Sequence, residues 1–142
     1  MSVYSAVLDI DTHDRTEMRD ITMSVAEVVS LAGVASGIVF ANALHTTCAL
    51  LVNEYQHSLV GDIRALAGRL VPSGAGYQHD DARYSDCERG NADSHLRTAL
   101  FGRSIAVGVD DGGLVLGRFQ SIIFAEFDGP RARRVSVQVL GR

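Results

Sequence analysis

Three histidines each stand among polar neighbours, and these three places carry the clearest chemical signal in the sequence. The segments are His45-Thr46-Thr47, His79-Asp80-Asp81 and Asn91-Ala92-Asp93-Ser94-His95. Hydroxyl, carboxylate and amide groups beside an imidazole can orient the ring and determine which nitrogen carries the proton. Such histidines are suited to bind a metal ion or to transfer a proton. The alternative is that they are ordinary loop or surface histidines.

Two of these histidines are expected at the end of a strand and in a long loop. His45 follows the apolar residues 37–43, which predict a buried strand, and Cys48–Asn53 predicts the next strand. His79 lies in residues 72–92, which are polar, contain glycine and lack apolar periodicity. A loop of that length is uncommon in a compact domain unless it has a function. The loop therefore favours a functional site, whereas His45 alone leaves a structural role open.

The third histidine, His95, is expected in the first turn of a short helix that Asn91 or Asp93 caps and Gly102 ends. The positive end of the helix dipole disfavours imidazolium there and leaves a neutral ring that can bind a metal. The unpaired backbone N–H groups of the same turn would equally accept a phosphate. Metal binding and phosphate binding therefore predict the same placement, and an exposed histidine is the alternative.

The remaining pattern predicts a single compact α+β domain over residues 1–142, with about three helices and a mainly antiparallel sheet. Hairpin-linked strands late in the chain favour this class over an alternating α/β fold. Strands are expected over residues 2–10, 16–21, 37–43, 48–53, 104–109, 114–127 and 134–140, with turns at residues 111–113 and 128–130.

Two longer helices precede the one that contains His95. Ser24 and Glu27 form a capping box, which predicts the start of the first helix, and Gly33 follows its end. The second helix is expected over residues 58–70. Its apolar residues, spaced four, three and four, predict one buried stripe made of Leu59, Ile63, Leu66 and Leu70.

Composition excludes several classes of protein. The net charge is -4 and no basic stripe is present, which argues against nucleic acid as a partner. All 13 basic side chains are arginines, so a catalytic lysine, a Schiff base and a P-loop are excluded. Cys48 and Cys87 form no CxxC motif, and two reduced thiols are expected. No signal peptide or membrane-spanning segment is apparent, so a cytoplasmic location is expected.

Several stretches of the chain resemble one family, the YjbQ family, whose members carry the label secondary thiamine-phosphate synthase. The resemblance runs almost from end to end. It rests on His45-Thr46-Thr47-Cys48-Ala49-Leu50, Asn53-Glu54, Asp62, Tyr77-Gln78-His79-Asp80, Ser94-His95-Leu96 and the stretch from Ser104 to Ile122 with Gly112, Gly117 and Gln120.

One short segment departs from the family pattern. The family usually has Gly-Thr-Trp-Gln where this chain has Gly117-Arg118-Phe119-Gln120. The arginine adds charge and bulk, and the phenylalanine lacks the indole N–H donor of tryptophan. If the segment contacts the ligand, this chain binds a different ligand or binds it less tightly.

The resemblance implies a homotrimer and a bound metal, expected to be zinc, at His45, His79 and His95. It also implies synthesis of thiamine phosphate, in which a pyrimidine diphosphate is joined to a thiazole phosphate and pyrophosphate is released. Glu54 or Asp80 would then orient a ligand or move a proton, and Arg97 would stabilise the leaving group. The residues expected to contact the substrate are Thr46, Thr47, Asn53, Gly117 and Gln120.

Three functions therefore remain open. The leading prediction is a zinc-dependent enzyme whose fourth metal position is open to water or a phosphate oxygen. The second is a protein that binds a metal or a phosphorylated small molecule without turnover. The third is a structural or interaction protein in which the histidines have no common role.

Overall fold

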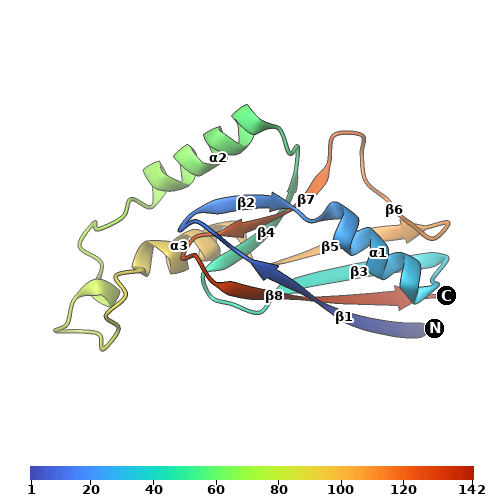
Figure 1. Cartoon of the computed structure of the whole chain (residues 1–142), viewed down its shortest axis with the longest axis horizontal. Coiled ribbons are helices and arrows are strands. Elements are labelled where there is room, and N and C mark those ends of the chain that lie inside the picture. The colour runs from blue at the N-terminus through green and yellow to red at the C-terminus, as the bar shows by residue number, and fades with distance from the viewer.

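Two antiparallel sheets form the framework of the molecule, and the computed structural model describes all residues from 1 to 142 (Figure 1). The larger sheet has the order β1 (Ser2–Asp11), β8 (Ala132–Gly141), β3 (Ser36–Ala43), β5 (Ser104–Asp110) and β6 (Gly113–Leu114). The smaller sheet has the order β2 (Glu17–Asp20), β7 (Ser121–Glu126) and β4 (Cys48–Asn53). Three helices accompany them: α1 (Thr22–Ala32), α2 (His57–Leu70) and α3 (Ala92–Phe101). The predicted α+β class with three helices and antiparallel pairing is therefore confirmed.

Most predicted strands are confirmed, and one is too long. The segment 114–127, expected as a single strand, contains only the two-residue β6 and, after a turn, β7. That turn is closed by the backbone hydrogen bond from the Gln120 N–H to the Gly117 carbonyl at 2.9 Å, and Gln120 Oε1 also accepts a hydrogen bond from the Gly117 N–H at 2.8 Å. The segment 37–43 is a strand, but Ile38 and Phe40 are exposed because only one face of the larger sheet is covered there.

The start of α1 differs from the prediction. The helix begins at Thr22, so Ser24 lies inside its first turn and the expected capping box does not form. The N-cap residue is Ile21, which has no polar side chain, and Asp20 before it accepts a hydrogen bond from the Thr22 N–H at 2.9 Å through its Oδ1. The end is as expected, since Gly33 has a φ of 63°, a conformation that glycine adopts at little cost.

The buried face of α2 is rotated from the predicted stripe. Ile63 and Ala67 are buried, whereas Leu66 and Leu70 are exposed. Ile63 and Ala67 are four residues apart and so lie on the same face of α2. The small side chain of Ala67 lets the α2 backbone lie close to the smaller sheet. This leaves two leucines of α2 in solvent.

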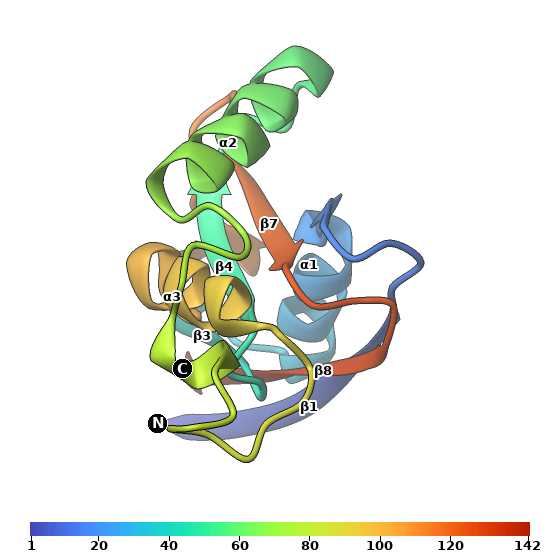
Figure 2. The same ribbon diagram turned by 90° about the vertical axis from the view of Figure 1, so that its left-hand side faces the viewer.

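The core has two parts that lie on opposite faces of the smaller sheet. Val25 and Val29 of α1 pack with Leu50, Phe124 and the inward residues of the larger sheet. On the other face, Ile63 and Ala67 of α2 pack with further residues of β4 and β7 (Figure 2). Both faces of β4 and β7 are therefore covered, which explains their nearly continuous apolar sequence. None of the helices combines the length and apolar character needed to cross a membrane.

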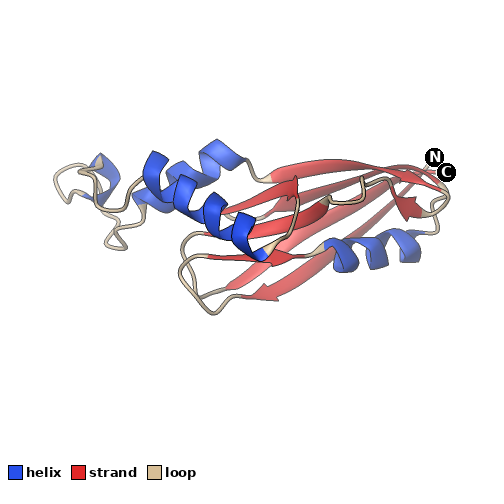
Figure 3. Ribbon diagram, turned by 90° about the horizontal axis from the view of Figure 1, so that it is seen from above, coloured by secondary structure: helices blue, strands red, loops and turns tan.

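The two ends of the molecule differ in character. Both chain termini lie at one end, and the loop of residues 72–91 with α3 lies at the other (Figure 1 and Figure 3). A short 3-10 helix, Gln78–Asp80, is the only regular element of that loop. The histidine-containing segments gather at this second end.

A buried ion pair connects the two sheets. Glu126 ends β7 and is fully buried, and Arg133 of β8 binds both of its carboxylate oxygens at 2.7 Å. Burial alone would raise the pKa of Glu126, but hydrogen bonds from Arg133, Thr12 and the backbone N–H of Asp128 outweigh it and lower the pKa. The same guanidinium donates to Thr47 Oγ1 at 3.1 Å. The pair therefore holds the segment that carries His45.

Replacing Arg133 with methionine should lower the free energy of unfolding by about 3–5 kcal/mol, because Glu126 is left as an unpaired buried charge. Urea denaturation measures the loss. Arg134→Met is the matched control, because the Arg134 side chain is exposed and lies 3.8 Å from an exposed Asp9. The control should lose under about 1 kcal/mol. Equal losses in the two variants would contradict the account.

Candidate functional site

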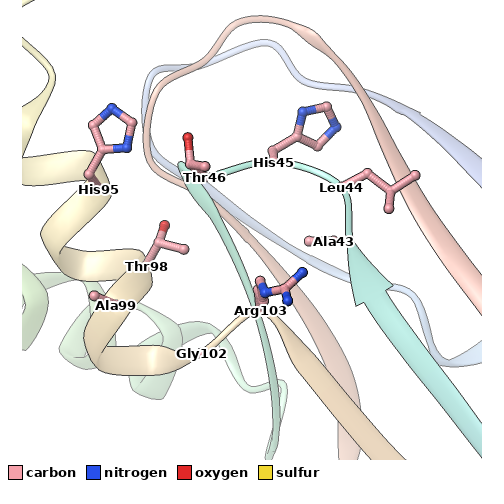
Figure 4. Close-up of a pocket in the computed structure, with 9 residues that line it drawn as sticks. All are labelled: Ala43, Leu44, His45, Thr46, His95, Thr98, Ala99, Gly102 and Arg103. Carbon is pink, nitrogen blue, oxygen red and sulfur yellow. The ribbon is translucent and has the colours of Figure 1, made fainter.

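Two adjoining concavities lie where β3 ends, β4 begins and α3 runs beside them. The first, called the α3 cavity, has a volume of about 740 Å³ and is shown with all its lining residues in Figure 4. The second, called the arginine pocket, has a volume of about 380 Å³ and is lined by Leu44, His45, Thr46, Thr47, Asn91, His95, Asp128, Arg131 and Arg133. Leu44, His45, Thr46 and His95 line both, so the two concavities share a wall.

His45 is held by the backbone of β8. Its Nε2 accepts a hydrogen bond from the Arg134 N–H at 2.8 Å. Burial, and then the positive charge of Arg133, lower the pKa of His45 below its ordinary value of 6.5. The Glu126 carboxylate opposes this shift in the pKa, and Arg131 and Arg134 add to it. The neutral ring therefore carries its proton on Nδ1. His45 thus presents an N–H donor in a positively charged setting, where an anion is favoured.

His79 and His95 lie against each other. Their ring centroids are 4.8 Å apart and their planes are inclined by 58°. The Nδ1 of His79 is covered by protein and has no hydrogen-bond partner, and it lies 3.6 Å from Asp80 Oδ1. The long loop therefore contacts α3 through His79, and the Nδ1 atom of His79 is left there without a hydrogen-bond partner.

The start of α3 is capped by a residue from the loop. Asp80 Oδ1 accepts a hydrogen bond from the Ala92 N–H at 3.0 Å. Asn91 does occupy the N-cap position, but its side chain donates to Asp128 instead of capping the helix. The prediction that Asn91 or Asp93 caps α3 is therefore confirmed for the position of Asn91, whereas the hydrogen bond to the first turn comes from Asp80. The carboxylate of Asp80 also takes one N–H that was expected to bind a phosphate.

Arg97 and Asp93 anchor α3 to the rest of the molecule. The guanidinium of Arg97 donates twice to the Val71 carbonyl, at 2.9 and 3.1 Å, and lies 3.5 Å from Asp93 Oδ2. Asp93 also accepts hydrogen bonds from Arg15 and Ser73. Arg97 is buried and lines neither concavity, so its contacts are those of a structural residue.

Four other candidate residues lie at the far end of the smaller sheet: Asn53, Glu54, Gly117 and Gln120. The register pairs Cys48 with Glu126 and Asn53 with Ser121, so β4 separates this group from the His45 segment by roughly 16 Å at 3.3 Å per residue. Asn53 Oδ1 accepts from the Glu54 N–H at 2.8 Å. Within one chain these residues do not share a site with the histidines.

The segment that departs from the family pattern lies with this second group. Arg118 covers the ring of its neighbour Phe119, with the guanidinium carbon 5.3 Å from the ring centroid. Phe119 is largely exposed. The two substitutions therefore alter the far end of the smaller sheet and leave the histidine end unchanged.

Both cysteines are free thiols, as expected. Cys48 is fully buried and its Sγ donates to Glu126 Oε2 at 3.3 Å. Burial and the adjacent Glu126 carboxylate raise the pKa of the Cys48 thiol, so it is an inert core residue at neutral pH. His13 and His57 are exposed and stand apart from both concavities.

Sequence reasoning missed the arginines of the site. Arg131 and Arg133 line the arginine pocket, and Arg103 lines the α3 cavity. The first two belong to the stretch Arg131-Ala132-Arg133-Arg134 directly after the Asp128-Gly129-Pro130 turn. Three arginines within four residues after a turn were the available signal. Arg131 and Arg133 reach the pocket only because antiparallel pairing places the start of β8 beside the end of β3, which the sequence pattern does not show.

The side chains do not converge on a metal position. No group of three or more histidine, cysteine, aspartate or glutamate side chains is arranged so that it could hold a metal ion. His79 and His95 are adjacent, but the Nε2 of His45 is already bonded to Arg134. A centre built on all three histidines would require His45 to release that bond.

Comparison with known proteins gives consistent matches over the whole length. The family model described as UPF0047 protein YjbQ-like matches residues 6–142. A UPF0047 protein of Methanothermobacter thermautotrophicus is 41% identical over 142 residues, which is 100% of this chain and 95% of that protein. One of Archaeoglobus fulgidus is 43% identical over 133 residues, covering 94% and 98%.

Solved structures agree with these matches. A YbjQ-like protein of unknown function from Sulfolobus solfataricus superposes with a TM-score of 0.92 at 30% identity and covers 99% of both chains. A hypothetical protein from Aeropyrum pernix has a TM-score of 0.89 at 32% identity, covering 98% of this chain and 99% of that one.

The lowered pKa of His45 predicts a definite pH dependence. The unfolded chain binds more protons than the folded chain between the folded pKa of His45 and 6.5, so the free energy of unfolding rises with pH across that window. The contribution of neutral His45 is fully present above 6.5 and is lost as the pH falls. NMR titration should place the His45 midpoint below 6.5, with the proton of the neutral ring on Nδ1.

The His45→Gln variant provides the control for this titration. It should lose the His45 resonance and the part of the stability change below pH 6.5 that His45 causes. A His45 midpoint at or above 6.5, or a neutral ring protonated on Nε2, would contradict the hydrogen bond to Arg134.

Proposed function

This chain belongs to the UPF0047 family of YjbQ-like proteins, and we propose that it binds a phosphorylated small molecule in the arginine pocket. The observation that carries the proposal is the hydrogen bond that His45 accepts from the Arg134 backbone. The Nε2 of His45 is occupied by the Arg134 N–H, so the donor on Nδ1 is available in a pocket lined by Arg131 and Arg133. An anion with several acceptor oxygens suits such a set of donors.

The charges of the pocket support an anionic ligand. Arg133 is neutralised by Glu126, and Asp128 is neutralised by Arg89, which binds both of its oxygens. Arg131 is exposed and makes no hydrogen bond or ion pair through its guanidinium, so its positive charge is free. Thr46 and Thr47 add hydroxyl groups to the same wall.

Thiamine-phosphate synthesis is the reaction that such a site would serve, as the family label implies. Both substrates and the released pyrophosphate are phosphorylated, so a phosphate-binding pocket suits them. The residues expected to act in catalysis give less support, because Glu54, Asp80 and Arg97 line neither concavity. The geometry therefore supports ligand binding more strongly than turnover.

A homotrimer remains part of this proposal. Leu66 and Leu70 of α2 and Leu96 and Leu100 of α3 are exposed, which is unusual for pairs of leucines one turn apart. A second copy of the chain would cover such side chains. Their exposure supports self-association, and the number of copies stays a prediction.

Pyrophosphate should bind the wild-type protein, and the Arg131→Gln variant should bind it about tenfold more weakly, a loss of about 1.4 kcal/mol. Isothermal titration calorimetry at two salt concentrations measures both, and added salt should weaken binding. Arg118→Gln is the control, because Arg118 lies at the far end of the smaller sheet. Absence of pyrophosphate binding, or equal losses in both variants, would contradict the proposal.

Turnover is tested separately with purified protein. Incubation with the pyrimidine diphosphate and the thiazole phosphate should yield thiamine phosphate and pyrophosphate if the family label applies to this chain. Absence of product together with tight pyrophosphate binding would leave the protein as a binding protein without that activity.

A zinc site is the second candidate function. It is supported by the covered Nδ1 of His79, which has no partner and belongs to a ring in contact with His95. His79 and His95 would supply two ligands, and His45 would supply a third only after releasing Arg134. Zinc, when bound, would polarise a phosphate oxygen as a Lewis acid.

Zinc content should separate this candidate from the first. If zinc is the ligand of this site, the wild-type protein retains about one zinc per chain after dialysis against a zinc buffer, and His79→Ala and His95→Ala each lose it. His57→Ala, an exposed histidine outside the site, is the control. Near-zero zinc in the wild type, or unchanged zinc in both variants, would exclude a histidine-bound metal. Elemental analysis by plasma mass spectrometry makes the measurement.

A further inference from the structure

A third concavity, called the α2 pocket, lies where α2 meets α3 and the segment before β2. It has a volume of about 390 Å³ and is lined by Thr16, Gly61, Arg64, Ala65, Gly68 and Arg97. We propose that this pocket binds the carboxylate group of a small organic acid. It shares no lining residue with the α3 cavity or the arginine pocket, so the inference does not depend on the proposed function.

Arg97 supplies a buried guanidinium with one free nitrogen. The residue is only 8% exposed, and its Nε and Nη2 both donate to the Val71 carbonyl. Its Nη1 has no hydrogen-bond partner, yet this atom is not enclosed by protein as the unpaired nitrogen of His79 is. Polar groups of buried side chains are nearly always paired. Because Arg97 lines the α2 pocket, an acceptor atom of a ligand there can complete its hydrogen bonding.

Arg64 and Thr16 supply two further free donors. Arg64 of α2 is exposed, and its guanidinium makes no hydrogen bond or ion pair within the chain. Thr16 comes directly before β2, and its hydroxyl group likewise has no hydrogen-bond partner. The pocket therefore combines donors from three separate parts of the chain, and two of the three carry a positive charge.

The carboxylates near the pocket are already bound elsewhere. Glu17, the neighbour of Thr16 in the sequence, accepts a hydrogen bond from Arg19 at 2.9 Å. Asp93 lies 3.5 Å from Nη2 of Arg97, but it also accepts hydrogen bonds from Arg15 and Ser73. No carboxylate lines the α2 pocket itself. An anion that enters the pocket therefore meets positive charge without a competing acid side chain.

The number and type of the donors favour a carboxylate over a phosphate. A carboxylate has two oxygens in one plane, which the planar guanidinium group of arginine matches. Phosphate has more acceptor oxygens and commonly takes backbone N–H groups at the start of a helix. The part of α2 that lines this pocket lies inside the helix, where the N–H groups are bonded to carbonyls of the preceding turn. Side-chain donors alone are therefore available, and one carboxylate satisfies them.

Small residues of α2 leave room for a short carbon chain. Gly61, Ala65 and Gly68 are spaced four and three residues apart, so they lie on one face of the helix. A Cβ atom added at Gly61 or at Gly68 would meet no atom within 4 Å, so the space above both glycines is open. The volume of the pocket lies at the lower end of the range of small-molecule sites. The ligand is therefore a short organic acid.

Titration of isotope-labelled protein with propionate, followed by NMR, tests the inference. Propionate should shift the backbone amide signals of Gly61, Ala65 and Gly68 until they saturate, whereas neutral propionamide should leave them unchanged. Arg64→Gln should weaken propionate binding about tenfold, because a free guanidinium is lost. Arg69→Gln is the matched control, since Arg69 is an exposed arginine of α2 outside the pocket. Its affinity should stay within about twofold of wild type.

Ala65→Leu is a second variant that fills the pocket and removes no charge. Ala65 and Arg64 are both exposed, so neither change disturbs the core, and Ala65→Leu should abolish the shifts of Gly61 and Gly68. The inference is overturned if propionate causes no saturable shift at these amides, or if Arg64→Gln and Arg69→Gln weaken binding equally. Unchanged binding in Ala65→Leu would also overturn it. Sulfate that saturates the same signals at a lower concentration than propionate would contradict the preference for a carboxylate.

Discussion

The buried pair of Glu126 and Arg133 is the constraint on which the rest of the structure depends. A fully buried carboxylate is tolerated only where its partners satisfy it, and five donors surround this one. The donors come from the end of β1, the start of β4, the segment after β7 and the strand β8. Because Arg133 also binds Thr47, the position of the His45 segment follows from the pair.

The same segment of chain holds α3 in place. Asp128, two residues after Glu126, accepts hydrogen bonds from Asn91 and Arg89, and the Phe127 carbonyl accepts one from the Ser94 hydroxyl at 2.6 Å. The helix is therefore fixed to the junction between the two sheets, and His95 is brought beside the His45 segment. The residues that line the arginine pocket therefore lie on strand ends and on a packed helix, which hold them in fixed positions.

Local patterns in the sequence predicted elements well and predicted nonlocal contacts poorly. Cys48–Asn53 is an apolar run with clear ends, and the strand has those bounds in the structure. The prediction of one strand over 114–127 was wrong because backbone and side-chain hydrogen bonds between Gly117 and Gln120 close a turn, which apolar periodicity does not report. Asp80 caps a helix that begins 12 residues later, and the Arg134 backbone determines the state of His45. Both contacts depend on the packed fold, so the histidines were identifiable from the sequence and their hydrogen-bonding roles were not.

The central claim is that the histidine end of the molecule is an anion site in which His45 acts as a donor. A crystal structure of the protein with bound pyrophosphate tests it most directly. The account predicts electron density for the anion in the arginine pocket, within hydrogen-bonding distance of His45 Nδ1 and Arg131, with the bond from the Arg134 N–H to His45 Nε2 intact. Pyrophosphate bound beside Asn53 and Gln120 instead, or a His45 ring turned away from Arg134, would contradict it.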